Sequence, residues 1–388
     1  MVVAAKGVRA GKKEVYTVKG IEIYYLAAWA AVVCLRAGTL ERAADGLPLK
    51  REKDGGTSAF TAWAYVALAC LPLVFLATFR HISVGTDTGT VYHPYYYMPY
   101  CVFGQRYTGT EAGFYLLIKT GYFLFRSFPG VLFCVALWTS VCFVAALFRT
   151  TDKRTVSLCA AYLLAFWYFD SLNIMRQSLA VAIVFLGYSF LKERSPARYA
   201  LCVLIATCFH NSAPIALSGL WFYYAAEKKP LFWITFSLLP LLVFILPTAL
   251  TVLEKAGLFV QYIDRYRGTG YDFSLVNFSL VLYRLPVYFL IAKHGKRLYK
   301  ESRFTRIALL AVIGALGCYL CKIRMVWLAR LSAYFLFFEG VLASNCVARE
   351  KNVLLAKTLC FLYFAGYFLL AYGVLKNGEI VPFSFVWG

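Results

Sequence analysis

The sequence reads Asp170-Ser-Leu-Asn-Ile-Met-Arg176-Gln177 at the start of one apolar run and Phe209-His210-Asn-Ser-Ala-Pro214 at the end of the next, with a basic turn at 192–198 between the runs. A chain that crosses a membrane and returns ends on the side where it began. The hairpin therefore predicts that Arg176, Gln177 and His210 share one membrane face. Ionisable groups toward the middle of a membrane cost up to about 3 kcal/mol, so they are seldom without a function there. The alternatives are an arginine that snorkels to lipid phosphate and a histidine that ends a helix.

Composition places the chain among polytopic membrane proteins. Of its 388 residues 61% are hydrophobic and 15% are charged, and the mean hydropathy is +0.66. Soluble proteins have a charged fraction of about 25%. The net charge of +21 lies in short loops between apolar runs, so it indicates membrane topology rather than a nucleic-acid partner. The 12 cysteines lie mostly inside apolar runs and form no cluster with histidines, which is typical of small core residues.

The apolar runs predict an all-α fold with about twelve transmembrane helices in a single membrane domain, 21–388, after a basic tail, 1–20. Several runs are shorter than the roughly 20 residues that a perpendicular helix needs, so some helices should extend into polar flanks. The expected spans are 21–37, 60–79, 129–148, 156–169, 178–191, 199–209, 212–226, 231–253, 274–292, 307–321, 331–346 and 353–375.

Lys and Arg are distributed unequally between alternate loops, and this predicts the orientation. One set of loops, which includes 149–155, 192–198 and 293–306, holds 22 of these residues, and the other set holds 10. The first set should face the cytoplasm. The outer loops are then 80–112, 170–177, 210–211, 254–273 and 322–330, together with the C-terminal residues 376–388. The basic tail disagrees with this scheme, because the scheme places it on the outer side of the membrane, where few Lys and Arg are expected.

The loop 80–112 contains five tyrosines within nine residues, from Tyr92 to Tyr100. Such a cluster predicts a platform on which sugars stack, although an interfacial aromatic belt has the same composition. The segment from Gly113 to Ser127 is interrupted by polar residues and predicts an amphipathic helix in the outer interface.

The outer loops hold many cations and few acids, which predicts an anionic ligand. The fork of an arginine suits phosphate, so a lipid diphosphate is the natural ligand. If a sugar leaves such a lipid, cations must stabilise the departing diphosphate, and the incoming hydroxyl needs a base. Arg176 together with Arg265 or Arg330 could serve the first need, and His210 or Asp87 the second. The candidate substrate- or diphosphate-binding residues are Arg80, Tyr92, Glu111, Arg176, Gln177, Arg265 and Arg330.

Other chemistries have weaker signals. His81, Asp87 and His93 could ligate a metal, but their spacing fits no known site, so we expect neither a metal nor another cofactor. The chain has no phosphate-binding glycine motif of the nucleotide-binding type. Arg284 lies inside an expected span and must face protein or a cavity.

The outer residues give the chain a resemblance to the EpsG family of exopolysaccharide polymerases, the Wzy-like membrane proteins of bacterial polysaccharide clusters. The resemblance covers roughly residues 60–385. The patches that carry it are Arg80 with Val84-Gly-Thr-Asp87-Thr88 and Tyr92; Glu111, Gly113, Phe114 and Leu117; Asn173 to Ala180 with His210 and Ser212; Tyr262 to Tyr266; and Arg330 to Phe335 with Pro382-Phe383. The basic tail and Ala112, where the family commonly has Pro, depart from the pattern.

The resemblance implies a glycosyltransferase at the outer face of the bacterial cytoplasmic membrane, with a GT-C-like arrangement as one expectation for its fold. Such a polymerase moves a growing glycan from undecaprenyl diphosphate onto the next lipid-linked repeat unit, without a nucleotide sugar or a metal. Membrane lipids, a chain-length regulator and a flippase are the implied partners. The alternatives are a ligase or another lipid-donor glycosyltransferase and, from another class, a transporter or flippase of lipid-linked sugars. The absence of an internal repeat disfavours the transporter.

Overall fold

A computed structural model describes residues 20–44, 56–94, 110–255, 282–321 and 326–387. Within these residues the chain is helical, and its one β-type contact is a bridge between Arg80 and Phe385. The α-helices are α1 (Ile21–Ala44), α2 (Gly56–Thr78), α5 (Ala112–Phe125), α6 (Phe128–Thr150), α7 (Val156–Phe166), α8 (Met175–Lys192), α9 (Pro196–Thr207), α10 (Ser218–Ala225), α11 (Lys229–Leu238), α12 (Leu242–Lys255), α15 (Leu285–Lys293), α16 (Gly295–Glu301), α17 (Arg303–Leu320), α18 (Leu336–Val347) and α19 (Val353–Phe368).

Shorter helical turns connect these helices. Four of them have 3-10 geometry near the site: η2 (Tyr168–Leu172), η3 (Ala213–Leu217), η6 (Val326–Phe335) and η8 (Asn377–Glu379). Two are π-helical, η1 (Thr88–Tyr92) and η7 (Leu369–Val374), and η4 (Leu239–Leu241) joins α11 to α12.

The described part of the chain contains five helical stretches that are long and apolar enough to cross a membrane. They are Ile21–Leu40, Phe128–Thr150, Lys229–Ala249, Arg303–Leu320 and Val353–Val374. Four further apolar helices, among them α7 and α9, are shorter. The expectation of an all-helical membrane protein agrees with this architecture, while the count of about twelve spans stays a prediction.

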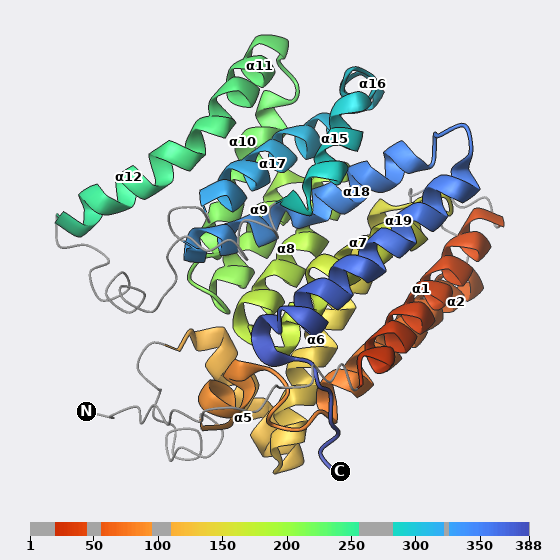
Figure 1. Cartoon of the computed structure of the whole chain (residues 1–388), viewed down its shortest axis with the longest axis vertical. Helices are drawn as coiled ribbons and strands as arrows, with labels where there is room; N and C mark the ends of the chain where they lie inside the picture. Colours follow the sequence, from red (N-terminus) through yellow and green to blue (C-terminus); the bar gives the residue numbers. More distant parts are fainter. Residues whose placement is uncertain (1–19, 45–55, 95–109, 256–281, 322–325, 388) are drawn as a thin grey trace.

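The core lies around α7 and α8, in the middle of the bundle (Figure 1). Every residue of α7 except Ala161 is buried, and α8 is buried along most of its length. A helix that is apolar on all sides must be covered by other helices, and here α1 and α2 lie on one side and α11 and α12 on the other (Figure 1).

Three of the expected spans are interrupted at one end. The run 156–169 leaves α-helical geometry after Phe166, and the runs 212–226 and 331–346 begin as the 3-10 helices η3 and η6. Non-helical backbone at membrane depth is tolerated where protein covers it or where it lines a cavity. Residues of η2 and η6 line such a cavity, described below. The expectation that some helices extend into polar flanks is confirmed for α8, which begins at Met175 and so starts before the expected span 178–191.

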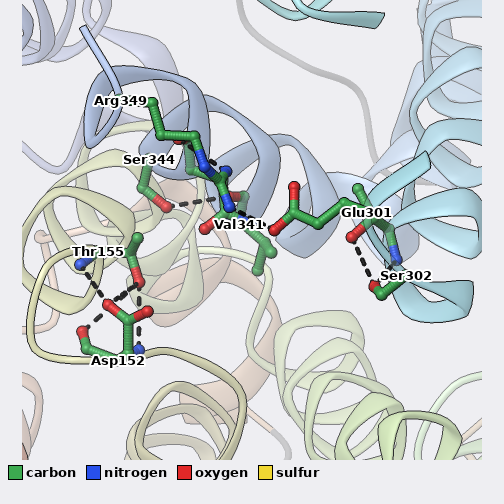
Figure 2. A network of polar contacts seen from close by, with 9 residues as sticks. Asp152, Thr155, Glu301, Ser302, Val341, Ser344 and Arg349 are labelled. Carbon is green, nitrogen blue, oxygen red and sulfur yellow. Dashed lines mark hydrogen bonds and ion pairs between the residues drawn. The ribbon is translucent and has the colours of Figure 1, made fainter. Parts of the chain in front are cut away.

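The connections at one end of the bundle are rich in Lys and Arg, and we call this the basic end. Figure 2 shows part of it: Arg349 forms an ion pair of 2.5 Å with Glu301, and Ser302 caps α17 by accepting the Thr305 N–H. The Asp152 carboxylate accepts hydrogen bonds from the backbone N–H groups of Arg154 and Thr155 just before α7 begins. These contacts close loops and helix ends at this side of the protein.

The opposite end, called the site end below, is closed by the C-terminal segment. The Val386 N–H donates to the Phe79 carbonyl, and the His81 N–H to the Ser384 carbonyl, at 2.8 Å each. Gly85 has a φ of 88°, and a side chain there would meet the Leu172 carbonyl, so the turn at the start of this loop requires glycine. In Figure 1 this end contains α5 and the C-terminus, at the bottom.

Candidate functional site at one end of the helical bundle

Arg176 and Glu111 form the central ion pair of the site. Arg176 lies in the first turn of α8, and Glu111 is the residue just before α5. Their side chains are 2.8 Å apart, and Glu111 is 6% exposed. The second Glu111 oxygen accepts the backbone N–H of Asn211 at 3.2 Å, so the carboxylate joins α5, α8 and the turn after α9. The predicted hairpin thus brings Arg176 next to the His210 turn.

His210 lies in that turn and is held by a chain of hydroxyl groups. Its Nδ1 is 2.7 Å from the Ser212 Oγ, which is 2.9 Å from the Tyr334 hydroxyl of η6. Burial lowers the pKa of His210 to about 4; the Glu111 carboxylate opposes this shift, and the charges of Arg176 and Arg330 add to it. At neutral pH the imidazole is therefore uncharged and can accept a proton.

Asp87 lies in the field of the same two arginines. Asn173 orients the turn that carries it, because its Oδ1 accepts the Asp87 N–H at 2.8 Å and the Thr86 hydroxyl at 2.9 Å. Burial raises the pKa of Asp87, while the charges of Arg330 and Arg176 lower it. A carboxylate with a raised pKa near two cations is a better proton acceptor than an ordinary surface aspartate.

Gln177 and Arg330 link α8 to η6. The Gln177 side-chain amide donates to the Arg330 carbonyl at 3.0 Å, and Gln177 is buried. The Arg330 side chain is exposed. Gln177 therefore fixes the backbone at Arg330 and leaves its guanidinium available at the protein surface.

A cavity of about 580 Å³ opens beside these residues, a size within the range of small-molecule sites, about 300–1,000 Å³. Its lining residues come from the loop after α2, from η2, α8 and η6 and from the C-terminal segment; we call the part lined by the exposed residues, among them Thr86, Arg330, Lys376 and Glu379, the mouth. The charged and amide side chains that line it are those of Asp87, Asp170, Asn173, Gln177, Arg284, Arg330, Lys376, Asn377 and Glu379. A polar cavity of this size can hold part of a glycan.

The sequence profile of the EpsG family matches residues 63–385, which is most of the chain. The chain belongs to the EpsG family. No curated protein and no solved structure matches it. Membership, together with the apolar helices, points to a polysaccharide-polymerase-like membrane protein of the glycosyltransferase kind.

The EpsG-family match includes Arg80, whose side chain is 2% exposed. Both of its terminal nitrogens donate to protein groups, one to the Ala77 carbonyl and the other to the Leu172 carbonyl at 3.2 Å and the Thr88 hydroxyl at 3.5 Å. Burial lowers the pKa of Arg80 to about 10, so it stays charged at neutral pH. In this conformation Arg80 joins α2 to η2, and its role as a diphosphate ligand stays a prediction.

The aromatic platform expected in this EpsG-family chain is represented by Tyr92 alone in the described residues, since 95–109 lie outside them. Tyr92 is buried, with its ring centroid 5.7 Å from that of Phe114 and its hydroxyl 3.5 Å from the Arg176 backbone nitrogen. Arg265 also lies outside the described residues. Among the described His, Cys, Asp and Glu side chains, no three gather as a metal site would require.

Sequence reasoning left Asp170, Lys376 and Glu379 out of the candidate site, although all three line the cavity. Asp170 begins the stretch that predicts the hairpin and contains Arg176, and this position in the sequence could have indicated that it belongs to the site. Lys376 and Glu379 carry no signal in the sequence, because only the return of the C-terminal segment to the loop after α2 brings them to the cavity.

Proposed function

We propose that this protein is an exopolysaccharide polymerase. It transfers a growing glycan from undecaprenyl diphosphate to a lipid-linked repeat unit at the outer face of the bacterial cytoplasmic membrane, and the site end faces outward. The observation that carries the proposal is that Asp87 and Arg330 line one polar cavity, at the end of the bundle where the Glu111 carboxylate joins Arg176 to the turn that carries His210. Family membership supports the same reaction class.

The reaction breaks the bond between the anomeric carbon of the donor sugar and the diphosphate oxygen. The diphosphate leaves with the electron pair, and the acceptor hydroxyl forms the new bond to the anomeric carbon while its proton passes to a base. Arg176 and Arg330 stabilise the charge that grows on the diphosphate, because guanidinium groups pair with phosphate oxygens through charge-assisted hydrogen bonds.

Asp87 is the base in this proposal. It lines the cavity, and burial raises its pKa. His210 is not among the cavity-lining residues. Its imidazole accepts the Ser212 N–H on Nδ1, and the Ser212 hydroxyl links it to the Tyr334 hydroxyl of η6, so in this proposal His210 positions η6, whose neighbouring residues line the cavity.

The test uses purified protein and lipid-diphosphate-linked repeat units from its own host, with the products separated on a gel. The parent protein should give a ladder of products, and Arg176→Ala and Asp87→Asn should abolish it. A single product instead of a ladder would indicate a ligase. If no product forms but the lipid-linked sugar crosses the bilayer of a reconstituted vesicle, the protein is a transporter and the proposal fails.

A ladder that survives Asp87→Asn but not His210→Ala would assign the base to His210. Arg349→Ala is the matched control for Arg176→Ala, because it removes an arginine from an ion pair at the basic end (Figure 2).

A further inference from the structure

The cavity extends from the charged mouth to a deep end that the proposed reaction does not use. We define the deep end by its buried lining residues Phe166, Trp167, Arg284 and Tyr319, together with the half-buried Asp170. Arg284 precedes the nine-residue helix α15, which runs to the basic end, and a helix rises about 1.5 Å per residue. Arg284 thus lies about 14 Å from the basic end of its helix, nearly half of the roughly 30 Å hydrocarbon thickness of a bilayer.

Charged side chains at the deep end are mostly satisfied by one another. Arg284 is 3.8 Å from Glu339, and the two Glu339 oxygens accept hydrogen bonds from the hydroxyls of Tyr162 and Tyr288. The Arg284 guanidinium lies 4.0 Å from the centroid of the Tyr319 ring. This confirms the prediction that Arg284 faces protein and a cavity.

Two cavity-lining residues nevertheless retain hydrogen-bond donors without an acceptor among the described residues. These donors are Nε of Arg284 and the indole Nε1 of Trp167, and both residues are more than nine-tenths buried; Nη1 of Arg284 also makes no hydrogen bond but lies in the ion pair with Glu339. Buried donors without an acceptor are rare in folded proteins and require an explanation. Since both residues contribute to the lining of the deep end, a ligand oxygen bound there is the acceptor that we assign to them.

The remaining groups at the deep end define the kind of ligand. Asp170 offers a carboxylate, which accepts the Tyr372 hydroxyl at 2.7 Å. The Arg284 guanidinium is already paired with the Glu339 carboxylate, and Asp170 adds a carboxylate to the lining, so the deep end does not favour an anion. The stacked rings of Phe166 and Tyr367, with centroids 3.9 Å apart, supply an apolar wall.

We propose that the deep end is a subsite for one uncharged sugar ring of the repeat unit. The Asp170 carboxylate accepts hydrogen bonds from sugar hydroxyls, Arg284 and Trp167 donate to sugar oxygens, and the aromatic wall contacts the C–H face of the ring. The diphosphate binds separately at the mouth, where Arg330 and Lys376 are exposed. The proposal rests on the proposed function and adds the substrate class and the residues that select it.

Two probes separate the deep end from the mouth. One is the repeat-unit oligosaccharide released from the host's lipid by mild acid, which lacks the diphosphate, and the other is inorganic diphosphate. Their dissociation constants for the purified protein are measured by thermophoresis. Asp170→Asn should weaken oligosaccharide binding by about 10-fold or more, because it removes a charged hydrogen-bond partner, and should leave diphosphate binding within about twofold. Arg330→Gln should have the opposite pattern.

A second variant guards against misfolding. Arg284→Gln alone leaves Glu339 buried without its cation, whereas Arg284→Gln with Glu339→Gln removes both charges. The double variant should weaken oligosaccharide binding and keep diphosphate binding. Asp152→Asn and Arg349→Gln, at the basic end, are the matched controls and should bind both probes as the parent does.

Three results would overturn the subsite: no oligosaccharide binding by the parent, unchanged oligosaccharide binding in Asp170→Asn, or parallel loss of both probes in Asp170→Asn and the double variant. The outcome is separable from that of the polymerase test. If the parent forms no product ladder but binds oligosaccharide through Asp170, the polymerase proposal fails and the subsite stands. If the ladder forms and Asp170→Asn binds oligosaccharide normally, only the subsite fails.

Discussion

The two ends of the bundle contain the same kinds of charged residue but place them differently. At the basic end the side chains of Arg349 and Glu301 are 29% and 30% exposed (Figure 2). At the site end the side chains of Arg176 and Glu111 are 23% and 6% exposed. Ion pairs between solvent-accessible side chains are worth about 0–1 kcal/mol, whereas removing one partner of a buried pair costs about 3–5 kcal/mol, and at the site end the Glu111 carboxylate is the buried partner. At the basic end the charged side chains therefore close loops, whereas at the site end they hold the candidate functional residues in place.

The sharpest test of this difference compares one arginine from each end. Arg176→Ala should reduce the rate of polymer formation about 100-fold or more, as expected when a donor to developing charge is lost. Arg349→Ala should change the rate by less than about twofold, because the ion pair of Arg349 with Glu301 lies at the basic end and is accessible to solvent. Both rates are measured with lipid-linked repeat units. Equal losses in the two variants would mean that the two ends do not differ in function.

The stability of the two ion pairs should differ as well. Glu111→Gln should lower the free energy of unfolding by about 3 kcal/mol, because Arg176 loses its carboxylate and the Asn211 N–H loses a charged acceptor. Glu301→Gln should lower it by less than about 1 kcal/mol. Unfolding by denaturant in detergent measures both values. If Glu111→Gln is as mild as Glu301→Gln, the pair at the site end is not a buried one.

Acid should reveal the burial of His210. Its pKa is lowered from 6.5 to about 4 in the folded protein, so below 6.5 the unfolded chain binds a proton that the folded chain does not. The stability that this histidine contributes is complete above pH 6.5 and is lost as the pH falls toward 4. The melting temperature of the parent should therefore fall more steeply over this range than that of His210→Gln. Parallel curves would show that the imidazole is solvated.

The smallest effect is expected at the basic end. Asp152→Ala removes a carboxylate that accepts two backbone N–H groups before α7 and should cost about 1 kcal/mol, while Asp152→Asn should be nearly neutral, since Asn serves equally well at such positions. Melting temperatures of the two variants check this order. A large loss of polymerisation in Asp152→Asn would show that this end also takes part in the reaction.

The sequence was sufficient to predict which residues the α8–α9 hairpin brings together. Arg176, Gln177 and His210 lie at one end because both helices are apolar and their joining turn is basic, which is a local pattern. That Asp170 and Arg284, or Asp87 and Lys376, line one cavity could not be predicted, because it depends on how distant segments pack. The 3-10 segments were missed for a related reason: their residues are as apolar as those of a continuous helix, and only the cavity distinguishes them.

The C-terminal segment also has a consequence for biosynthesis. The carbonyls of Glu379 and Ser384 hold the loop after α2, yet the ribosome adds these residues almost at the end of the printed sequence. While the chain is being inserted, the cavity therefore lacks one wall, and its mouth is complete only when this segment has emerged. All the other residues that line the cavity are therefore synthesised before its mouth is complete.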